Sequence, residues 1–166
     1  MKILAISGSL RAASKNSSLL RALAELEPSI EISEGIGELP HFNPDVDDAG
    51  APQSVLRYRE ALRAADVVLI SSPEYAHGVP GVLKNAHGVV GSGELIGKTV
   101  VLLNASAAST FVAAQLSETL SVMSARVARV ATIVLAGRTV SDDAVQAELA
   151  SLCDDLRSIH STARSS

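Results

Sequence analysis

Apolar residues recur along the chain in short continuous runs, separated by longer stretches with helical spacing. Four runs are typical of buried strands: Ile3–Ser7, Val67–Ser71, Val100–Asn104 and Val127–Leu135. A fifth, Ile30–Ile32, alternates apolar and charged residues as an edge strand does. Strands that alternate with helices predict a parallel sheet covered by helices on both faces.

Outside these runs, apolar residues return every three or four positions, which is the spacing of an amphipathic helix. Five such stripes occur, at residues 19–26, 55–65, 82–90, 112–123 and 145–159. Five strands and five helices predict one doubly wound α/β domain over residues 1–160, followed by a flexible tail at Ser161–Ser166. Gly35–Pro52 is rich in proline, glycine and aspartate, so we interpret it as a surface loop with solvated carboxylates.

The amino-acid composition argues against some kinds of binding partner. The chain has 166 residues, of which 47% are hydrophobic and 2% aromatic, and its formal net charge is −4. An acidic chain with few aromatic rings is a poor match for nucleic acid or anionic lipid, so we expect neither nucleic acid nor a membrane as partner. No apolar run approaches the roughly 20 residues that span a bilayer, and a strand starts at Ile3, so we expect a cytoplasmic protein. Cys153 lies on an apolar helical stripe, and we interpret it as a packing residue.

The loop after the first strand has the composition of a phosphate site. Hydroxyl groups, an arginine and an asparagine stand directly before a helical stripe. A helix start offers unpaired backbone N–H groups and a positive dipole end, and both favour a compact dianion. An ordinary Ser/Asn helix cap beside a solvated arginine is the alternative interpretation. The candidate phosphate ligands are Ser9, Arg11, Ser14, Asn16 and Ser17.

Motifs that this loop lacks limit the ligand further. It has no Gly-x-x-x-x-Gly-Lys-Ser/Thr, which disfavours ATP and GTP, and no Gly-x-Gly-x-x-Gly, which disfavours a permanently bound dinucleotide. It also has no cysteine, which excludes a thiolate phosphatase of the strand–loop–helix kind. A terminal phosphomonoester such as that of FMN fits the remaining donors.

A second loop, Ser71–Gly81, follows the third strand of the predicted sheet and reads Ser-Ser-Pro-Glu-Tyr-Ala-His-Gly-Val-Pro-Gly. In a sheet of order 2-1-3-4-5, strands one and three are neighbours, and the loops that follow them meet where such sheets bind ligands. The loop at Asn104–Ser109 leaves the fourth strand at the same edge. The sequence therefore predicts one crevice formed by three loops.

Taken together, these motifs resemble the NADPH-dependent FMN reductase family, whose members are flavodoxin-like flavoproteins. The most specific matches are Gly8-Ser9-Leu10-Arg11 with Ser14 and Asn16, and Pro73-Glu74-Tyr75 with Pro80-Gly81 and Lys84-Asn85-Ala86. The resemblance implies that the first loop holds the FMN phosphate and that the other two loops contact the isoalloxazine ring. The ring-lining residues would be Pro73, Glu74, Tyr75, Ala76, His77 and Gly78, with Ser106 on the other side.

The resemblance also implies an activity. NADPH or NADH would reduce bound FMN, and the electrons would then pass to a small acceptor, such as a flavin, quinone, azo or nitro compound or metal oxyanion, by a ping-pong mechanism. FMN would carry the chemistry, so no side chain is assigned a catalytic role and no metal is expected. Because relatives assemble, a homodimer or homotetramer is expected. Two alternatives stay open: a non-enzymatic electron-transfer protein that binds FMN, and a degenerate member with a structural or regulatory role.

The chain departs from the family pattern at several positions. Ala76 stands where asparagine is common, which predicts a weaker contact near the flavin. His87-Gly88-Val89 replaces an aliphatic residue, an aspartate and an aromatic residue, and Gly88 predicts an early end of that helix. For Lys84 and Asn85 we expect capping and interface hydrogen bonds, whereas His77 faces either the flavin or solvent.

Overall fold

Five parallel strands form one sheet in the order β2-β1-β3-β4-β5, as the sequence predicts. The computed structural model describes residues 1–90 and 93–163. Within these residues the elements are β1 (Ile3–Ser7), α1 (Lys15–Leu26), β2 (Ile30–Ile32), the 3₁₀ turn η1 (Ile36–Glu38), α2 (Pro44–Asp48), α3 (Gln53–Ala64), β3 (Val67–Ser71), α4 (Gly81–Gly88), β4 (Thr99–Asn104), α5 (Phe111–Val122), β5 (Arg126–Thr132) and α6 (Asp143–Ala163).

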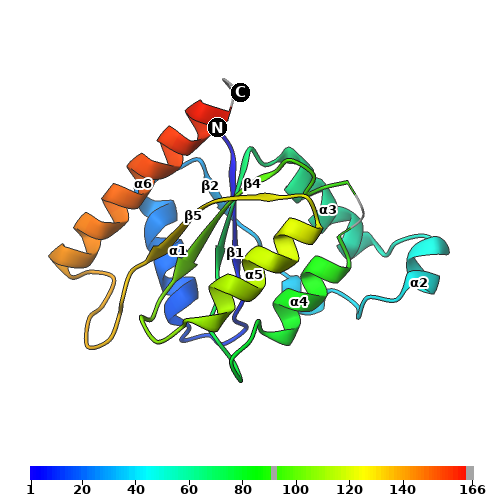
Figure 1. Cartoon of the computed structure of the whole chain (residues 1–166), viewed down its shortest axis with the longest axis horizontal. Coiled ribbons are helices and arrows are strands. Elements are labelled where there is room, and N and C mark those ends of the chain that lie inside the picture. Colours follow the sequence, from blue (N-terminus) through cyan, green and yellow to red (C-terminus); the bar gives the residue numbers. More distant parts are fainter. Residues whose placement is uncertain (91–92, 164–166) are drawn as a thin grey trace.

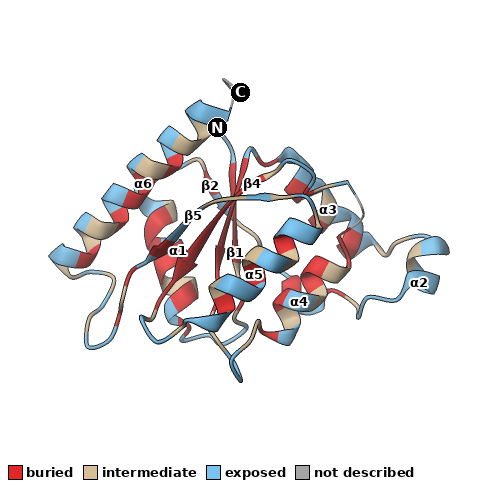
Figure 2. Cartoon of the chain, in the orientation of Figure 1, coloured by how far each residue is buried: buried red, intermediate tan, exposed pale blue. Residues whose placement is uncertain are grey.

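Helices cover both faces of this sheet (Figure 1). α1 and α6 pack on one face, against strand residues such as Ile3, Leu69 and Val101. α3, α4 and α5 pack on the other face, against neighbours such as Leu4 and Ile70. The three central strands are therefore buried on both sides (Figure 2), which explains why they read as continuous apolar runs in the sequence.

The last strand differs from the prediction in extent and in burial. β5 ends at Thr132, and residues 133–135 leave the sheet, although the Ile133 N–H still bonds the Asn104 carbonyl oxygen at 2.9 Å. β5 lies at the edge of the sheet, and Val130 is exposed, so the prediction of a fully buried strand was wrong here. The arginines Arg126 and Arg129 stand in this strand, as is common for an unpaired sheet edge.

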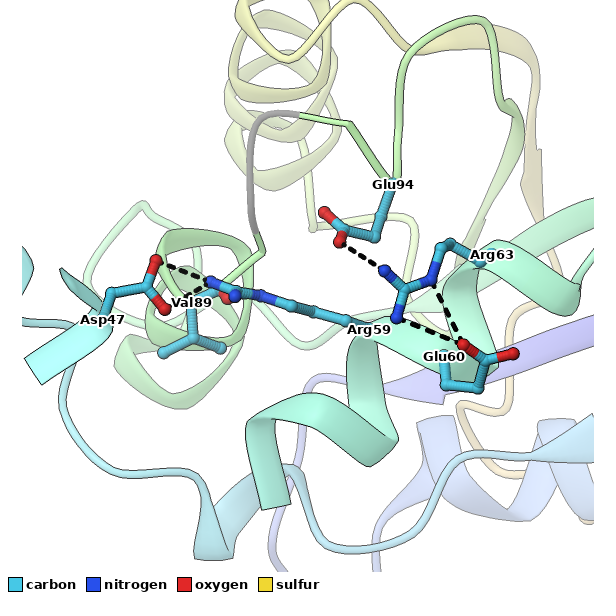
Figure 3. A network of polar contacts seen from close by, with 6 residues as sticks. All are labelled: Asp47, Arg59, Glu60, Arg63, Val89 and Glu94. Atoms are coloured by element: carbon cyan, nitrogen blue, oxygen red, sulfur yellow. Dashed lines mark hydrogen bonds and ion pairs between the residues drawn. The ribbon is translucent and has the colours of Figure 1, made fainter. Parts of the chain in front are cut away.

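The acidic segment at residues 35–52 is more ordered than a surface loop. It contains η1 and the short helix α2, and Arg59 of α3 holds it in place (Figure 3). The Arg59 guanidinium donates to both carboxylate oxygens of Asp47 at 2.9 Å and to the Val89 carbonyl oxygen at 2.8 Å. Asp47 is thus paired with an arginine rather than solvated. In the described part of the chain, no three His, Cys, Asp or Glu side chains gather as a metal site would require.

Helix α4 makes the interface contacts expected of it. Asn85 accepts from the Phe42 N–H and donates to the Pro40 carbonyl oxygen, both at 2.9 Å. Lys84 donates to the Thr119 hydroxyl of α5 at 3.2 Å. The helix ends at Gly88, as expected.

The C-terminal helix, α6, continues to Ala163, three residues into the segment expected to be a tail, whereas residues 164–166 lie outside the described part. Cys153 of this helix is buried in the core, which confirms its packing role. Among the described residues, no helix combines the length and the apolar character that crossing a membrane requires.

Candidate functional site

The start of α1 and the loops after β3 and β4 meet at the carboxyl edge of the sheet and, with Ala136 beyond β5, line a cleft of about 340 Å³. Four predicted site residues line it: Asn16 from the start of α1, Pro73 and Glu74 from the loop after β3, and Ser106 from the loop after β4. Lys15 lines the same cleft and adds a positive charge. The crevice expected from the topology is therefore present.

The loop after β1 is folded by its own polar groups. Ser14 is the N-cap of α1, and its hydroxyl oxygen accepts from the Ser17 N–H at 3.3 Å. The Ser9 hydroxyl oxygen accepts from the Arg11 N–H at 3.3 Å, and the Arg11 carbonyl oxygen accepts from the Ser14 N–H at 3.1 Å. With the Ser17 N–H capped, the N–H groups of the first helical turn that a ligand could use are those of Lys15 and Asn16.

Asn16 has a structural role besides its position at the cleft. It is buried, and its Oδ1 accepts from the Ser71 hydroxyl at 3.0 Å, which ties α1 to β3. Ser71 also bonds the Leu103 carbonyl oxygen at 3.1 Å. Because Oδ1 is used internally, the Nδ2 donors are the part of Asn16 that could reach a phosphate.

None of the other four predicted phosphate ligands lines this cleft, and Ser14 is buried as the cap of α1. Ser9 and Ser17 line a neighbouring groove of about 510 Å³ on the β2 side, which also contains Arg21 and Glu34. Arg11 is exposed on the loop after β1 and lines neither the cleft nor this groove. The structure thus brings Asn16 into the cleft and leaves Ser9, Ser17 and Arg11 around it.

The first and second loops approach each other closely at Gly8. Its N–H bonds the Ser71 carbonyl oxygen at 2.8 Å, and a Cβ added to it would lie 2.7 Å from the Ser72 hydroxyl and 3.0 Å from Leu83. Ser72 and Leu83 are both buried, so neither can move aside freely. Only a residue without a side chain fits this crossing.

Replacing Gly8 with alanine is therefore expected to lower the free energy of unfolding by about 1–2 kcal/mol through overpacking. Urea unfolding of the purified variant measures this change. Gly81→Ala is the matched control, because a Cβ at Gly81 meets nothing within 4 Å and it should leave stability unchanged or slightly raised. Equal stabilities of the two variants would contradict the close-approach argument.

The second loop carries a tight turn at Tyr75–Gly78. Two backbone hydrogen bonds close it, from the Tyr75 N–H to Gly78 at 3.1 Å and from the Gly78 N–H to Tyr75 at 2.9 Å. Ala76 and His77 between them have φ of 49° and 56°, which is the left-handed arrangement of a type I′ turn. All four residues are predicted site residues, but none of them lines the cleft that Pro73 and Glu74 line.

Ala76 is an unfavourable residue for this conformation, because an L-residue with a Cβ is strained at positive φ. Asparagine tolerates left-handed φ, which gives a backbone reason for its frequency at this position in the family that the sequence resembles. Ala76→Asn and Ala76→Gly are expected to raise the free energy of unfolding by about 0.5–1 kcal/mol. Thermal unfolding measures the change, and Ala76→Val should shift it the other way. A stabilising valine would contradict the assigned turn.

Glu74 is used to cap helix α5. Its Oε2 accepts from the N–H groups of Phe111 at 2.7 Å and Val112 at 3.1 Å, and its Oε1 lies 3.3 Å from His77 Nδ1. Burial tends to raise the pKa of Glu74, but the Val112 and Phe111 N–H groups and His77 outweigh it and lower the pKa. Glu74 is therefore a charged N-terminal cap as well as a residue that lines the cleft.

Two residues of α5 at the site were missed from the sequence. The Phe111 ring packs edge-on against the His77 ring, with centroids 4.8 Å apart. The Gln115 amide donates to the His77 carbonyl oxygen at 2.9 Å and accepts from the Val79 N–H at 3.2 Å. No local motif marks either residue, because each acts through a loop more than 30 positions earlier in the chain.

Comparison with known proteins finds relatives among FMN and quinone reductases. A region of 89 residues is 47% identical to an NAD(P)H-dependent FMN reductase of Pseudomonas aeruginosa, covering 52% of this chain and 48% of that protein. A region of 82 residues is 46% identical to a quinone reductase of Pseudomonas putida, covering 48% of this chain and 44% of that one. The chain thus spans about half the length of the curated relatives it matches.

Similarity to solved structures extends over more of the chain. FerB, a flavoenzyme NAD(P)H:(acceptor) oxidoreductase from Paracoccus denitrificans, superposes with a TM-score of 0.74 at 28% identity, over 93% of this chain and 94% of its own. The family model for NADPH-dependent FMN reductases matches residues 1–139, a range that includes all three loops of the cleft. The chain therefore belongs to the NADPH-dependent FMN reductase family.

Proposed function

We propose that this protein is an FMN-dependent oxidoreductase that takes electrons from NADPH or NADH and passes them to a small acceptor. The observation that carries this proposal is the cleft at the carboxyl ends of β1, β3 and β4, which contains Asn16, Pro73, Glu74 and Ser106. Family membership supports the cofactor, and the names of the relatives support the class of reaction.

The donors around the first loop fit the FMN phosphate. The Lys15 and Asn16 N–H groups lie at the start of α1, where the helix dipole favours an anion. The Lys15 ammonium lines the cleft, and the Arg11 guanidinium is free on the loop beside it. The Ser9, Ser14 and Ser17 hydroxyls do not line this cleft: Ser14 caps α1, and the Ser17 hydroxyl bonds the Ser7 hydroxyl at 2.8 Å. The proposal at the cleft therefore rests on Lys15, Asn16 and Arg11. A dianion placed here would meet donors and positive charge from several directions.

The second loop fits the isoalloxazine ring through its backbone. In a turn of this kind the two outer residues pair with each other, so the N–H groups of Ala76 and His77 at its tip stay available to a ligand. Such groups donate to ring oxygens and nitrogens without titrating. Ser106 lines the cleft from the loop after β4 and is proposed to contact the ring from that side.

Bound FMN would supply the redox chemistry, accepting hydride from the nicotinamide and releasing electrons to the second substrate in separate half-reactions. The protein's part is to hold the ring in an open cleft, where planar molecules can stack in turn. Flavins, quinones, azo and nitro compounds are suitable acceptors on this basis, and metal oxyanions could accept electrons at the exposed ring.

An anaerobic titration tests the proposal. The FMN-loaded protein is mixed with NADPH and, separately, with NADH, while the flavin absorbance is followed. Bleaching by one of the two, and return of colour on adding a quinone, is the expected result. Bound flavin that neither nicotinamide bleaches would instead indicate an electron-transfer protein, and failure to bind FMN would indicate a degenerate member.

We also propose that the protein forms a homodimer or homotetramer. Helices α4 and α5 leave a groove of about 630 Å³ between them, lined by Val90, Ile96, Val122 and Met123. Val122 and Ile96 are mostly exposed and line the same groove, and contiguous exposed apolar surface is typical of a protein interface. Light scattering is expected to give a mass of two or four chains, and Val122→Lys should lower it. A monomeric wild type would contradict the assembly.

A further inference from the structure

The side-chain amide of Gln115 spans the exit of the turn in the second loop. Nε2 donates to the His77 carbonyl oxygen at 2.9 Å, and Oε1 accepts from the Val79 N–H at 3.2 Å. The amide nitrogen and the amide oxygen of Gln115 therefore each make a hydrogen bond to the loop, one on either side of Gly78. A Cβ on Gly78 would come within 3.2 Å of Gln115 Oε1, so the fit between helix and loop is close.

The turn that these bonds hold contains strained backbone. Ala76 and His77 are both left-handed although neither is glycine. Strained conformations of this kind persist only where surrounding contacts determine them. The two Gln115 bonds supply such contacts at one end of the turn. Glu74, which caps α5, supplies them at the other end.

Gln115 belongs to α5, whose core side is fixed by the buried residues Val112, Leu116 and Leu120. The Gln115 side chain thus fixes an exposed loop relative to a helix that is itself packed against the core. Tyr75, Ala76 and His77 are all solvent-exposed, so the loop has little burial of its own to define its shape.

We propose that Gln115 is a positioning residue that keeps the turn at Tyr75–Gly78 in the shape that receives the isoalloxazine ring. This inference rests on the proposed function, because it assumes that the ring lies against this loop. The proposed role of Gln115 can be distinguished by measurement from the proposed role of the first loop, which is to bind the phosphate. Loss of Gln115 should weaken binding of the ring itself, with or without a phosphate.

The test compares FMN with riboflavin, which lacks the phosphate. Gln115→Ala is expected to weaken binding of both flavins by a similar factor of about tenfold, because either flavin would then have to order a turn that Gln115 no longer holds in place. Gln115→Glu keeps the acceptor for the Val79 N–H but places a carboxylate against the His77 carbonyl oxygen, so it should not restore binding. The flavin midpoint potential should become more negative in both variants, because fewer ordered N–H groups stabilise the reduced ring.

The matched control is Gln146→Ala. Gln146 of α6 donates from Nε2 to the Val140 carbonyl oxygen at 2.6 Å, so it too is a helix glutamine that holds a loop, but it lies outside the cleft. Its replacement should leave flavin affinity and potential unchanged. Amide hydrogen exchange in the flavin-free protein gives an independent readout, since Gln115→Ala should speed exchange of the Val79 N–H.

The results separate this proposal from the function on which it rests. A wild-type protein that binds neither flavin overturns the proposed function and this inference with it. A wild type that binds both, beside a Gln115→Ala variant with unchanged affinity and potential, overturns the positioning role alone. A variant that loses FMN but keeps riboflavin affinity also overturns it, because the effect would then lie at the phosphate.

Discussion

Acidification from pH 6.5 toward pH 4 is expected to destabilise the protein by up to about 3 kcal/mol through His87. Burial lowers the pKa of His87 from 6.5 to about 4, and the positive charge of Lys84 lowers it further in the same direction. In the unfolded chain the imidazole binds a proton near its ordinary pKa, whereas in the folded chain it stays neutral. The unfolded state therefore binds more protons across this range, and stability falls as the pH falls.

Burial of the neutral His87 imidazole also lowers the free energy of unfolding. The side chain is 4% exposed, and neither ring nitrogen has a hydrogen-bond partner in the described structure. A buried polar group without a partner costs about 1–3 kcal/mol. Replacing His87 with leucine is therefore expected to raise the free energy of unfolding at pH 7 as well as to remove the loss on acidification.

Urea unfolding of the wild type and His87→Leu at several pH values between 7 and 5 measures the difference at pH 7 and the part of the acid loss, about 2 kcal/mol, that falls above pH 5. In this window the carboxylates with lowered pKa, Glu27, Glu74 and Asp142, are still ionised, because their contributions are lost only below their ordinary pKa values near 4. His41→Leu is the control, since His41 is exposed. A wild type with constant stability across the window, or a His87→Leu variant with an unchanged slope, would contradict the argument.

The central part of the fold could be predicted from the sequence for a physical reason. Strands buried on both faces have to be apolar at every position, so β1, β3 and β4 stand out as continuous runs. The sequence predicts too long a β5 because the apolar residues continue past Thr132 into the core. An edge strand is also not required to be apolar at every position, so its end is less clearly marked. α2 was missed because Arg59, a distant partner in the sequence, fixes it.

The place of the candidate site could be predicted from the topology, but several contacts within it could not. Loops after neighbouring parallel strands must meet at one edge, so Asn16, Pro73 and Ser106 could be expected together. The cap that Glu74 places on α5, and the bonds of Gln115, join residues 36 to 38 positions apart. Such contacts leave no local pattern, because the tertiary arrangement of helix and loop creates them.

Removing the Arg11 guanidinium is expected to weaken FMN binding by about 1.5–3 kcal/mol, or roughly 10- to 150-fold, if the first loop holds the phosphate as proposed. Arg11 is exposed and carries its charge on a loop whose backbone is fixed by Ser9 and Ser14. Its side chain can therefore turn toward a dianion at the start of α1 without unfolding the loop. Fluorescence titration of the flavin-free Arg11→Ala variant with FMN measures the loss.

Two controls, riboflavin as ligand and the Arg57→Ala variant, test whether the loss of FMN affinity in Arg11→Ala arises at the phosphate. Affinity for riboflavin should not change in Arg11→Ala, because the guanidinium is assigned to the phosphate. Arg57→Ala, which removes the same charge from an exposed position on α3, should leave FMN affinity near that of the wild type. The effect of Arg11 should also shrink as salt is raised, since an exposed charge pair is screened. Equal losses for FMN and riboflavin, or an equal loss in Arg57→Ala, would show that Arg11 does not contact the phosphate.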